Sequence, residues 1–503
     1  MKQPLHYCAA STLVQMMEQG EITSESLTLY LLQRIKDVNP DINAVVTVAE
    51  EQALIQARAA DQARQRGDTL GPLHGLPLTL KDTWEVPGMS CTAGASVLAE
   101  YQPEKPADVV RRLTDAGAFV LGKTNVPYYA SDLQSFNRLH GTSNNPWDLK
   151  RTPGGSSGGA AAALAAGLTP LEVGSDLAGS IRTPAHFCGV FGHKPSRTLV
   201  SFRGHVPGPP GTLVQPDLAE GGPMARNARD LELLLRTIAG PGEALARSWQ
   251  LSMEPARFTE LRQVRAGLWL EDPLCPVEHE QINGFRKLAD TLSHEGALVS
   301  QASHPLLTLE RILPAYFNLL GSLLSGGLSS RQKRHLRMFA LAEKPLRRMT
   351  PVTHGMAEYA RGTSQSIDQW MRWNEIREKM RNEVESLFGE VDVLLTPVNP
   401  VTAIHHDQKS PQFRRQIRVN GETRSYMDQF CWIAFATLLG LPATSVPIGV
   451  TRHGLPYSIQ VIGAPGRDLT TLKFAQLLEQ HGLAGFRVPE RYQTVSKEKH
   501  EHP

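Results

Sequence analysis

Short apolar runs alternate with helix-forming stretches along two parts of the chain, residues 70–240 and about 385–490. Leu76–Leu80 is typical of a strand that is buried on both faces of a sheet. Ala160–Ala166 is strongly helix-forming, and Gly167 directly after it has the position of a helix C-cap. This alternation predicts an α/β fold, in which helices cover both faces of a central mixed sheet.

The other two parts of the chain have mainly helical patterns. Residues 1–68 are a predicted helical lead-in, with a helix start at Thr23–Ser26 and a run rich in Ala, Glu, Gln and Arg at Ala49–Arg66. Residues 275–390 are a second helical region. Within it, Ile312–Ser330 is uncharged but broken by proline and glycine, which favours a core helix with a loop. The alternative is a helix at the mouth of a site or against a membrane.

No Pro/Gly/Ser-rich linker or low-complexity tract divides the 503 residues. A chain of this length would ordinarily suggest two or three domains. Because related motifs lie near both ends of the chain, we predict a single large α/β domain instead. Its predicted extent is 1–493, made of the lead-in at 1–68, a catalytic core at 70–240, the helical region at about 275–390 and a C-terminal part of the core at 391–490, followed by a frayed tail at 494–503.

Charge and hydropathy exclude several classes of partner. The net charge of +2 gives no reason to expect nucleic acid or an anionic membrane. Met1–Gly20 lacks the continuous apolar core of a secretory signal. Glycine and proline interrupt Gln429–Thr451, which favours a buried helix followed by a strand over a membrane span. We expect a cytoplasmic protein without stable membrane anchoring, and a homodimer stays open.

Cysteine and histidine usage gives no sign of a disulfide or a metal site. The cysteines are odd in number, scattered and without a C-x-x-C pair, which favours reduced thiols. The 17 histidines show no H-E-x-x-H or other ligand spacing, so we expect no metal and no cofactor. The five cysteines are Cys8, Cys91, Cys188, Cys275 and Cys431.

Two serines lie in two separate glycine-rich turns. Ser156 lies in Arg151–Gly159 and Ser180 lies in Gly174–Pro184, 24 residues further on. The helix between them, of about 9 residues, rises ~14 Å. The short strand that begins at Leu171 returns ~16 Å over about 5 residues. We therefore expect both hydroxyls at the same edge of the sheet, in turns that allow close backbone approach.

A lysine ends the predicted strand upstream of these turns. Lys81 follows Leu80 at the carboxyl end, the edge where open α/β sheets place their sites. Burial there disfavours the ammonium and lowers the pKa of the lysine, as a base near neutral pH requires. Asp82 could oppose this by pairing with Lys81, but alternation along a strand points adjacent side chains to opposite faces.

Together these pieces resemble the amidase signature family, serine hydrolases of C–N amide bonds. The resemblance rests on Lys81, on the turn Gly154–Gly159 and on the segment Asp176–Arg182, and it covers roughly residues 8–490, more weakly between about 240 and 385. It implies an α/β/α sandwich with a central mixed sheet and a variable helical region that shapes substrate access. Further similar segments are Leu121–Asn125, Asn145–Asp148, Phe187–Gly189, Gly192–Pro195, Asp392–Pro397, Gly440–Ala443 and Gln460–Gly463.

The resemblance also implies roles for the site residues. Ser180 would be the nucleophile, Ser156 the bridging serine and Lys81 the terminal base, with a cis peptide bond between Gly155 and Ser156. The implied reaction is hydrolysis of a small-molecule carboxylic amide through an acyl-enzyme on Ser180, which yields a carboxylate and ammonia or an amine. Ser156 would carry the proton from Ser180 to neutral Lys81 and return it to the leaving nitrogen.

The turn before the nucleophile is expected to stabilise the oxyanion. By the resemblance, its backbone N–H groups point at the developing negative charge. Alanine stands where most members have the first of two glycines, but an alanine N–H donates as well as a glycine N–H. The implied donors are Leu177, Ala178, Gly179 and Ser180.

Supporting roles fall to residues beside the two serines. Asp176 and Arg182 are predicted to brace the turn around Ser180 as an ion pair, with direct substrate contact as the alternative. Gly155 and Ser157 are expected to support the turn that holds the bridging serine.

Residues after the predicted strand end at 123–125 are candidates for the substrate pocket. Tyr128, Asp132 and Gln134 are the main candidates. Surface or core packing explains each of them equally well. The same stretch also holds Tyr129, Ser135 and Asn137.

Two other motifs fit the first serine turn less well. Gly154–Gly158 matches the G-x-S-x-G elbow of α/β-hydrolases, which would make Ser156 the nucleophile, but Lys150–Pro153 is not the β-branched strand that this elbow needs. The turn also lacks the Gly-Lys-Ser/Thr ending of a phosphate-binding loop.

A different class of function is also open. The alternative is a glutaminase-type A subunit of a tRNA-dependent amidotransferase complex, although Asp217–Pro223 lacks the Asp-Gln pair that we expect of that subunit. A non-catalytic binding protein is disfavoured, because Lys81, Ser156 and Ser180 are all present.

Overall fold

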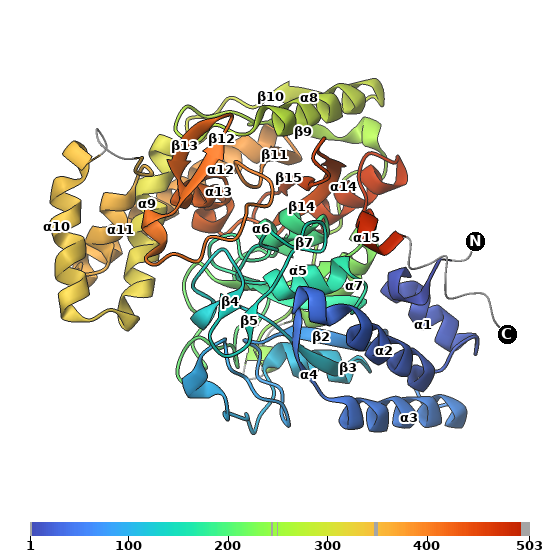
Figure 1. Ribbon diagram of the computed structural model, residues 1–503. Coiled ribbons are helices and arrows are strands. Elements are labelled where there is room, and N and C mark those ends of the chain that lie inside the picture. Colours follow the sequence, from blue (N-terminus) through green and yellow to red (C-terminus); the bar gives the residue numbers. More distant parts are fainter. Residues whose placement is uncertain (1–2, 243–244, 249, 347–350, 494–503) are drawn as a thin grey trace.

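The computed structural model describes residues 3–242, 245–248, 250–346 and 351–493. The predicted tail at 494–503 lies outside the described residues. A sheet of 11 strands runs through the described part of the chain (Figure 1). In sheet order the strands are β1 (Val45–Val48), β3 (Phe119–Thr124), β2 (Pro77–Lys81), β6 (Leu171–Asp176), β8 (Glu220–Ala225), β7 (Phe191–Lys194), β14 (Ala443–Val450), β15 (Pro456–Ile462), β11 (Val393–Pro397), β9 (Arg265–Leu268) and β10 (Leu298–Gln301).

This sheet is mixed, as predicted. β2 is parallel to both of its neighbours, β3 and β6. From β6 to β11 each pair of neighbours is antiparallel, and β11, β9 and β10 are parallel again. β2 and β6 are parallel neighbours, so their carboxyl ends, at Lys81 and Asp176, lie at the same edge of the sheet.

Helices cover both faces of the sheet. Met224 on β8 packs into a cluster with Ala161 of α5 and Ile181, whereas its neighbour Ala225 packs into the main core with Leu231 of α7. Adjacent strand residues point to opposite faces, so α5 and α7 lie on different sides. The helices are α1 (Ala10–Glu18), α2 (Ser24–Ile42), α3 (Glu50–Arg66), α4 (Asp108–Asp115), α5 (Gly158–Ala165), α6 (Arg182–Cys188), α7 (Ala228–Ile238), α8 (His279–His294), α9 (Leu309–Leu323), α10 (Ser330–Leu346), α11 (Met356–Gly362), α12 (Ile367–Glu390), α13 (Cys431–Leu439), α14 (Asp468–Gln480) and α15 (Glu490–Gln493).

Local signals placed several of these elements correctly. Thr23 caps α2, because its hydroxyl accepts the N–H of Ser26 at 3.0 Å while the Ser26 hydroxyl accepts the N–H of Thr23 at 3.0 Å. α3 covers the predicted helix, and α5 is followed by Gly167 with a φ of +71°.

The uncharged stretch at Ile312–Ser330 falls mainly in α9, most of which is buried, so the core-helix interpretation is confirmed. Gln429–Thr451 forms α13 followed by β14, as predicted. In Figure 1, α10 and α11 stand beside α9 at one side of the molecule. No helix in the described ranges has the length and apolar character needed to cross a membrane.

Two regions that the sequence predicts to be mainly helical also contain strands. β1 lies within the predicted lead-in, and β10 lies within the predicted helical region. Each has only four residues and forms one edge of the sheet. β10 is largely exposed, since Leu298 keeps 68% of its surface accessible, so it lacks the apolar pattern that marks a strand.

Candidate active site

The turn that holds Ser156 is fixed by a neighbouring segment of chain. The peptide bond between Gly155 and Ser156 is cis. The backbone around Asp132 lies against this bond, and a Cβ added to Gly155 would come within 2.6 Å of the Asp132 carbonyl oxygen. Ser135 holds the same turn, because its hydroxyl donates to the carbonyl of Gly154 at 3.0 Å. Only glycine therefore fits at position 155.

Lys81 meets Ser156 inside the protein. Lys81 is the last residue of β2 and is fully buried, and its Nζ lies 2.7 Å from the Oγ of Ser156. Burial lowers the pKa of Lys81 to about 7, while the negative charges of Asp176 and Glu172 work in the opposite direction. A substantial fraction of Lys81 is therefore neutral near pH 7 and able to accept a proton.

Asp82 turns away from Lys81, as strand alternation predicts. Its carboxylate lies 3.3 Å from the Nζ of Lys123 on β3 and accepts a hydrogen bond from the hydroxyl of Thr92. The direct partners of Lys81 are instead hydroxyl and carbonyl oxygens.

The two serine turns are joined to each other. The N–H of Ser157 donates to the carbonyl of Ser180 at 3.1 Å. Ser180 lies between the end of β6 and the start of α6, and only 8% of its surface is accessible. The two glycine-rich turns therefore meet at one edge of the sheet, as the lengths of the connecting elements predict.

A buried ion pair braces the turn around Ser180. Arg182 donates to both carboxylate oxygens of Asp176, at 2.8 and 3.0 Å, and no part of either side chain is accessible. Burial works to raise the pKa of Asp176, but Arg182 outweighs it and lowers that pKa to about 2. The remaining three N–H groups of Arg182 donate to the carbonyl of Ile433, to Gln460 and to the hydroxyl of Thr437. No donor of Arg182 is left over for a substrate in this arrangement.

The oxyanion turn has fewer free donors than the sequence implies. The N–H of Gly179 already donates to Asp176 at 2.9 Å. In the described part of the chain, the N–H groups of Leu177, Ala178 and Ser180 make no hydrogen bond. The candidate oxyanion donors therefore narrow to these three groups.

The candidate pocket residues have protein partners. Asp132 forms an ion pair with Arg415, at 2.7 and 2.9 Å, and accepts the hydroxyl of Tyr426 at 2.9 Å. Gln134 binds the backbone of Asp407 through both ends of its amide. These contacts tie the serine turn to the C-terminal part of the chain, which favours packing over substrate contact for Asp132 and Gln134.

The other aromatic and polar candidates lie further out or are likewise occupied. Tyr128 is 56% accessible, and Tyr129 has a φ of +48°. Asn137 donates to Asn125 at 2.8 Å. In the described residues, the side chains of Tyr128, Tyr129 and Asn137 make no hydrogen bond to Lys81 or Ser156. Ser135 does, because its hydroxyl lies 3.4 Å from the carbonyl oxygen of Ser156.

Two polar side chains beside Lys81 were missed from the sequence. The Nζ of Lys81 lies 2.9 Å from the Oγ of Ser175, and Ser175 in turn lies 2.8 Å from the Nε2 of His205. Ser175 could have been noticed, because it directly precedes Asp176 in the family segment. His205 lies in a loop whose sequence gives no signal that it returns to the end of β2.

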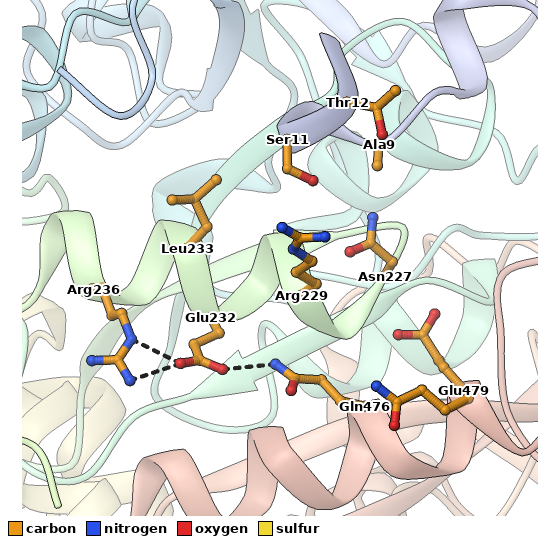
Figure 2. Close-up of a pocket in the computed structure, with 11 residues that line it drawn as sticks. Ala9, Ser11, Thr12, Asn227, Arg229, Glu232, Leu233, Arg236, Gln476 and Glu479 are labelled. Carbon is orange, nitrogen blue, oxygen red and sulfur yellow. Dashed lines mark hydrogen bonds and ion pairs between the residues drawn. The ribbon is translucent and has the colours of Figure 1, made fainter. Parts of the chain in front are cut away.

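A groove at the surface lies elsewhere, between α1, α7 and α14 (Figure 2). Several polar side chains in its walls bind one another: Glu232 accepts hydrogen bonds from Arg236 at 2.8 Å and from Gln476 at 2.7 Å. None of Lys81, Ser156 and Ser180 lines it. The chemistry therefore has to be sought in the buried site rather than in this groove.

Two of the five thiols, those of Cys275 and Cys431, lie close enough to interact with each other. All five cysteines are free and buried in the structure. No group of three His, Cys, Asp or Glu side chains is arranged to hold a metal ion in the ranges that the structure covers.

Comparison with known proteins decides the family. A family model described as Amidase matches residues 26–472. The chain belongs to the amidase family. This amidase-family chain is thus a hydrolase that acts on amide C–N bonds, and it has the fold of that family.

Curated relatives resemble the amidase-family chain over nearly its whole length. One is the A subunit of a glutamyl-tRNA(Gln) amidotransferase from Moorella thermoacetica, 34% identical over 505 residues, covering 97% of this chain and 99% of that protein. The corresponding A subunit from Chromohalobacter salexigens is 33% identical and covers 95% of this chain and 97% of its own length.

Solved structures show the same fold. A structure titled as an amidase has a TM-score of 0.73 at 28% identity, covering 94% of this chain and all of that chain. A chain from a vestigial protein complex, said to reveal the evolutionary origins of an s-triazine catabolic enzyme, has a TM-score of 0.77 at 26% identity, covering 95% and 100%.

Proposed function

We propose that this chain hydrolyses a carboxylic amide through an acyl-enzyme on Ser180, with Ser156 as the proton relay and Lys81 as the terminal base. The observation that carries the proposal is the 2.7 Å contact between Nζ of Lys81 and Oγ of Ser156 in a fully buried site. The family membership and the junction of the two serine turns support it.

The first half of the reaction forms the acyl-enzyme. The Oγ of Ser180 attacks the amide carbon while its proton passes to Ser156, whose own proton passes to neutral Lys81. The negative charge on the former carbonyl oxygen is stabilised by the free N–H groups of the turn, among Leu177, Ala178 and Ser180. The C–N bond then breaks, and the leaving nitrogen takes the proton back from Lys81 through Ser156.

The second half releases the acid. Water attacks the ester carbon of acyl-Ser180, and its proton follows the same path to Lys81. Collapse of the second tetrahedral intermediate breaks the bond to the Oγ of Ser180, which recovers a proton from Ser156. The products are a carboxylate and ammonia or an amine, and Lys81 ends neutral.

Covalent labelling tests the nucleophile. A fluorophosphonate probe should label Ser180, and peptide mapping should find the label on the peptide that contains residues 174–184. Ser180→Ala should abolish labelling, whereas Ser131→Ala, a change of an exposed serine, should leave it intact. Label on Ser156 would favour the hydrolase-elbow interpretation and overturn the proposal.

A second candidate function concerns the source of the amide. The curated relatives above are A subunits of glutamyl-tRNA(Gln) amidotransferases, which favours glutamine as the amide and a protein complex as the setting. Against it stands the segment Asp217–Pro223, which lacks the Asp-Gln pair expected of such proteins. Its Glu220 is fully buried and accepts the N–H of Thr198 at 3.0 Å.

An amide panel separates the two candidates. Release of ammonia or amine should be measured for purified chain with aliphatic, aryl and amino-acid amides, and with glutamine in the presence and absence of partner proteins of an amidotransferase. Turnover of a simple amide by the chain alone supports the stand-alone amidase. Glutamine hydrolysis that appears only with the partners supports the role within a complex.

A further inference from the structure

The side chain of Lys81 has one more hydroxyl partner than a proton relay requires. Its Nζ lies 2.7 Å from Oγ of Ser156, 2.9 Å from Oγ of Ser175 and 3.3 Å from the carbonyl oxygen of Ser175. A neutral amine has two N–H donors and a single lone pair. The carbonyl can only accept, so it takes one N–H, and the two hydroxyls compete for the lone pair.

The direction of the Ser175 hydroxyl proton therefore decides whether Lys81 is a base toward Ser156. If Ser175 donates to Lys81, the lone pair is occupied and Lys81 has only an N–H left for Ser156. If Ser175 donates elsewhere, the lone pair faces the Ser156 proton, as the relay needs.

His205 provides that other acceptor. Its Nε2 lies 2.8 Å from Oγ of Ser175, and its ring is buried between Trp84 and Phe202, with centroids 4.6 and 4.1 Å away. The loop that carries His205 is bound to the segment directly after Lys81, because the N–H of Val206 donates to the carbonyl of Thr83 at 2.7 Å. The histidine is thereby held at a fixed place relative to the end of β2.

The ring of His205 is neutral in these surroundings. Burial lowers the pKa of His205, and the positive charges of Lys81 and Lys123 lower it further. In the described residues its Nδ1 has no hydrogen-bond partner. A neutral ring with its proton on Nδ1 leaves Nε2 free to accept from Ser175.

We propose that His205, with its proton on Nδ1, is a positioning residue that accepts the Ser175 hydroxyl proton and so keeps the lone pair of Lys81 directed at Ser156. This inference rests on the proposed function. The same arrangement also suits the charged state: after the relay, the three N–H donors of the ammonium meet Ser156 Oγ, Ser175 Oγ and Ser175 O, and no hydroxyl has to turn.

Variants at positions 205 and 175 test the proposal, because they should change kcat in opposite directions. His205→Phe keeps an aromatic ring but removes the acceptor, so Ser175 is free to donate to Lys81; kcat should fall about tenfold or more with KM within about twofold. Ser175→Ala in that background removes the competing hydroxyl, so the double variant should be faster than His205→Phe alone. A double variant that is slower than the single variant would overturn the proposal.

The pH dependence of kcat separates the proposed positioning role from a packing role, because loss of packing alone would not shift it. In His205→Phe, the Ser175 hydroxyl stabilises the neutral amine, so the acid limb of kcat should move to lower pH. His205→Gln, whose amide oxygen can accept from Ser175, should keep both the limb and most of the rate. Phe202→Leu, a packing control beside the ring, should leave the limb in place.

A spectroscopic measurement keeps the proposal testable if a variant fails to fold. The ¹⁵N chemical shifts of the imidazole in selectively labelled full-length protein, assigned by difference with His205→Gln, should show a proton on Nδ1. A proton on Nε2 would overturn the positioning role. Failure of the proposed function is distinguishable, because it would appear as loss of Ser180 labelling in the wild-type chain.

Discussion

Two lysines on adjacent strands are both fully buried, and they meet different partners. Lys123 on β3 lies 3.3 Å from the carboxylate of Asp82 and donates to the carbonyl of Trp84 at 2.8 Å. Among the described residues, the side chain of Lys81 on β2 hydrogen-bonds only to Ser156 and Ser175, which are uncharged. The two lysines thus lie at the same edge of the sheet and are equally buried, but their partners differ. Lys123 has a negatively charged partner, whereas Lys81 has uncharged oxygens.

This difference shows what turns a buried lysine into a base. Burial alone disfavours the ammonium, and a carboxylate in contact compensates that cost. Around Lys81 the cost of burying the ammonium is only partly compensated. The negative charges of Asp176 and Glu172 favour the ammonium, but burial outweighs them, and the pKa of Lys81 falls to about 7. The pair of Lys123 and Asp82 is therefore structural, whereas Lys81 is available for proton transfer.

The largest expected effect is the loss of the base. Lys81→Ala should lower kcat by about 10³-fold or more, since no other group accepts the proton from Ser156, while the fold is retained. Steady-state kinetics and circular dichroism check this. Lys81→Arg should not restore turnover, because a guanidinium stays protonated.

A double variant sharpens this result. In the proposed relay Lys81, Ser156 and Ser180 act as a unit, so the Lys81→Ala/Ser180→Ala variant should be little worse than Ser180→Ala alone. Near-normal turnover of Lys81→Ala at pH 7 to 8 would show that the proton leaves by another path, and the relay would have to be abandoned.

The next effect, of comparable free energy, concerns stability instead of rate. Lys123→Met keeps most of the side-chain volume but leaves Asp82 buried without its cation, which should cost on the order of 3–5 kcal/mol of unfolding free energy. A lower midpoint in urea denaturation checks this. An unchanged midpoint together with a large loss of kcat would make the two lysines alike and break the comparison.

A smaller effect is the pH dependence near neutrality. Because burial lowers the pKa of Lys81 to about 7, the base is protonated below that pH and neutral above it. kcat should therefore rise about tenfold per pH unit well below pH 7 and level off above it. An acid limb that lies above pH 9 would mean that burial does not lower the pKa of Lys81.

The smallest expected effect tests whether the charge of Glu172 partly compensates the burial of the Lys81 ammonium. Glu172 is buried on β6, accepts the hydroxyl of Thr79 at 2.8 Å and, when ionised, raises the pKa of Lys81. Burial raises the pKa of Glu172 itself to about 7, so its charge is present mainly above that pH. Glu172→Gln removes this charge, so the acid limb should move slightly to lower pH, and activity at pH 7 relative to the plateau should rise by less than about twofold. A shift of the acid limb to higher pH would contradict the expected effect of Glu172 on the pKa of Lys81. The matched control is Glu232→Gln, in the surface groove that Lys81 does not line.

Features that local chemistry decides could be predicted from the sequence. The helix start at Thr23, the buried strand before Lys81 and the opposite directions of Lys81 and Asp82 each follow from a few adjacent residues. The meeting of the two serine turns follows from the lengths of one helix and one strand.

Features that depend on distant chain could not be predicted. β1 and β10 are four-residue edge strands whose pairing with β3 and β9 defines them, and their own patterns are weak. The partners of Asp132 lie more than 280 residues away, so nothing local marks it as a packing residue. His205 reaches Lys81 only because its loop returns to the end of β2.

The supports of the two serine turns are synthesised much later than the turns themselves. Both serine turns are complete by residue 184, but Arg415 holds the segment behind Ser156, and Gln460 holds Arg182 from 278 positions further on. A ribosome adds roughly 5–20 residues per second, so a nascent chain carries both serine turns for many seconds before these braces exist. The arrangement of the two turns is therefore complete only after residues 415 and 460 have been added.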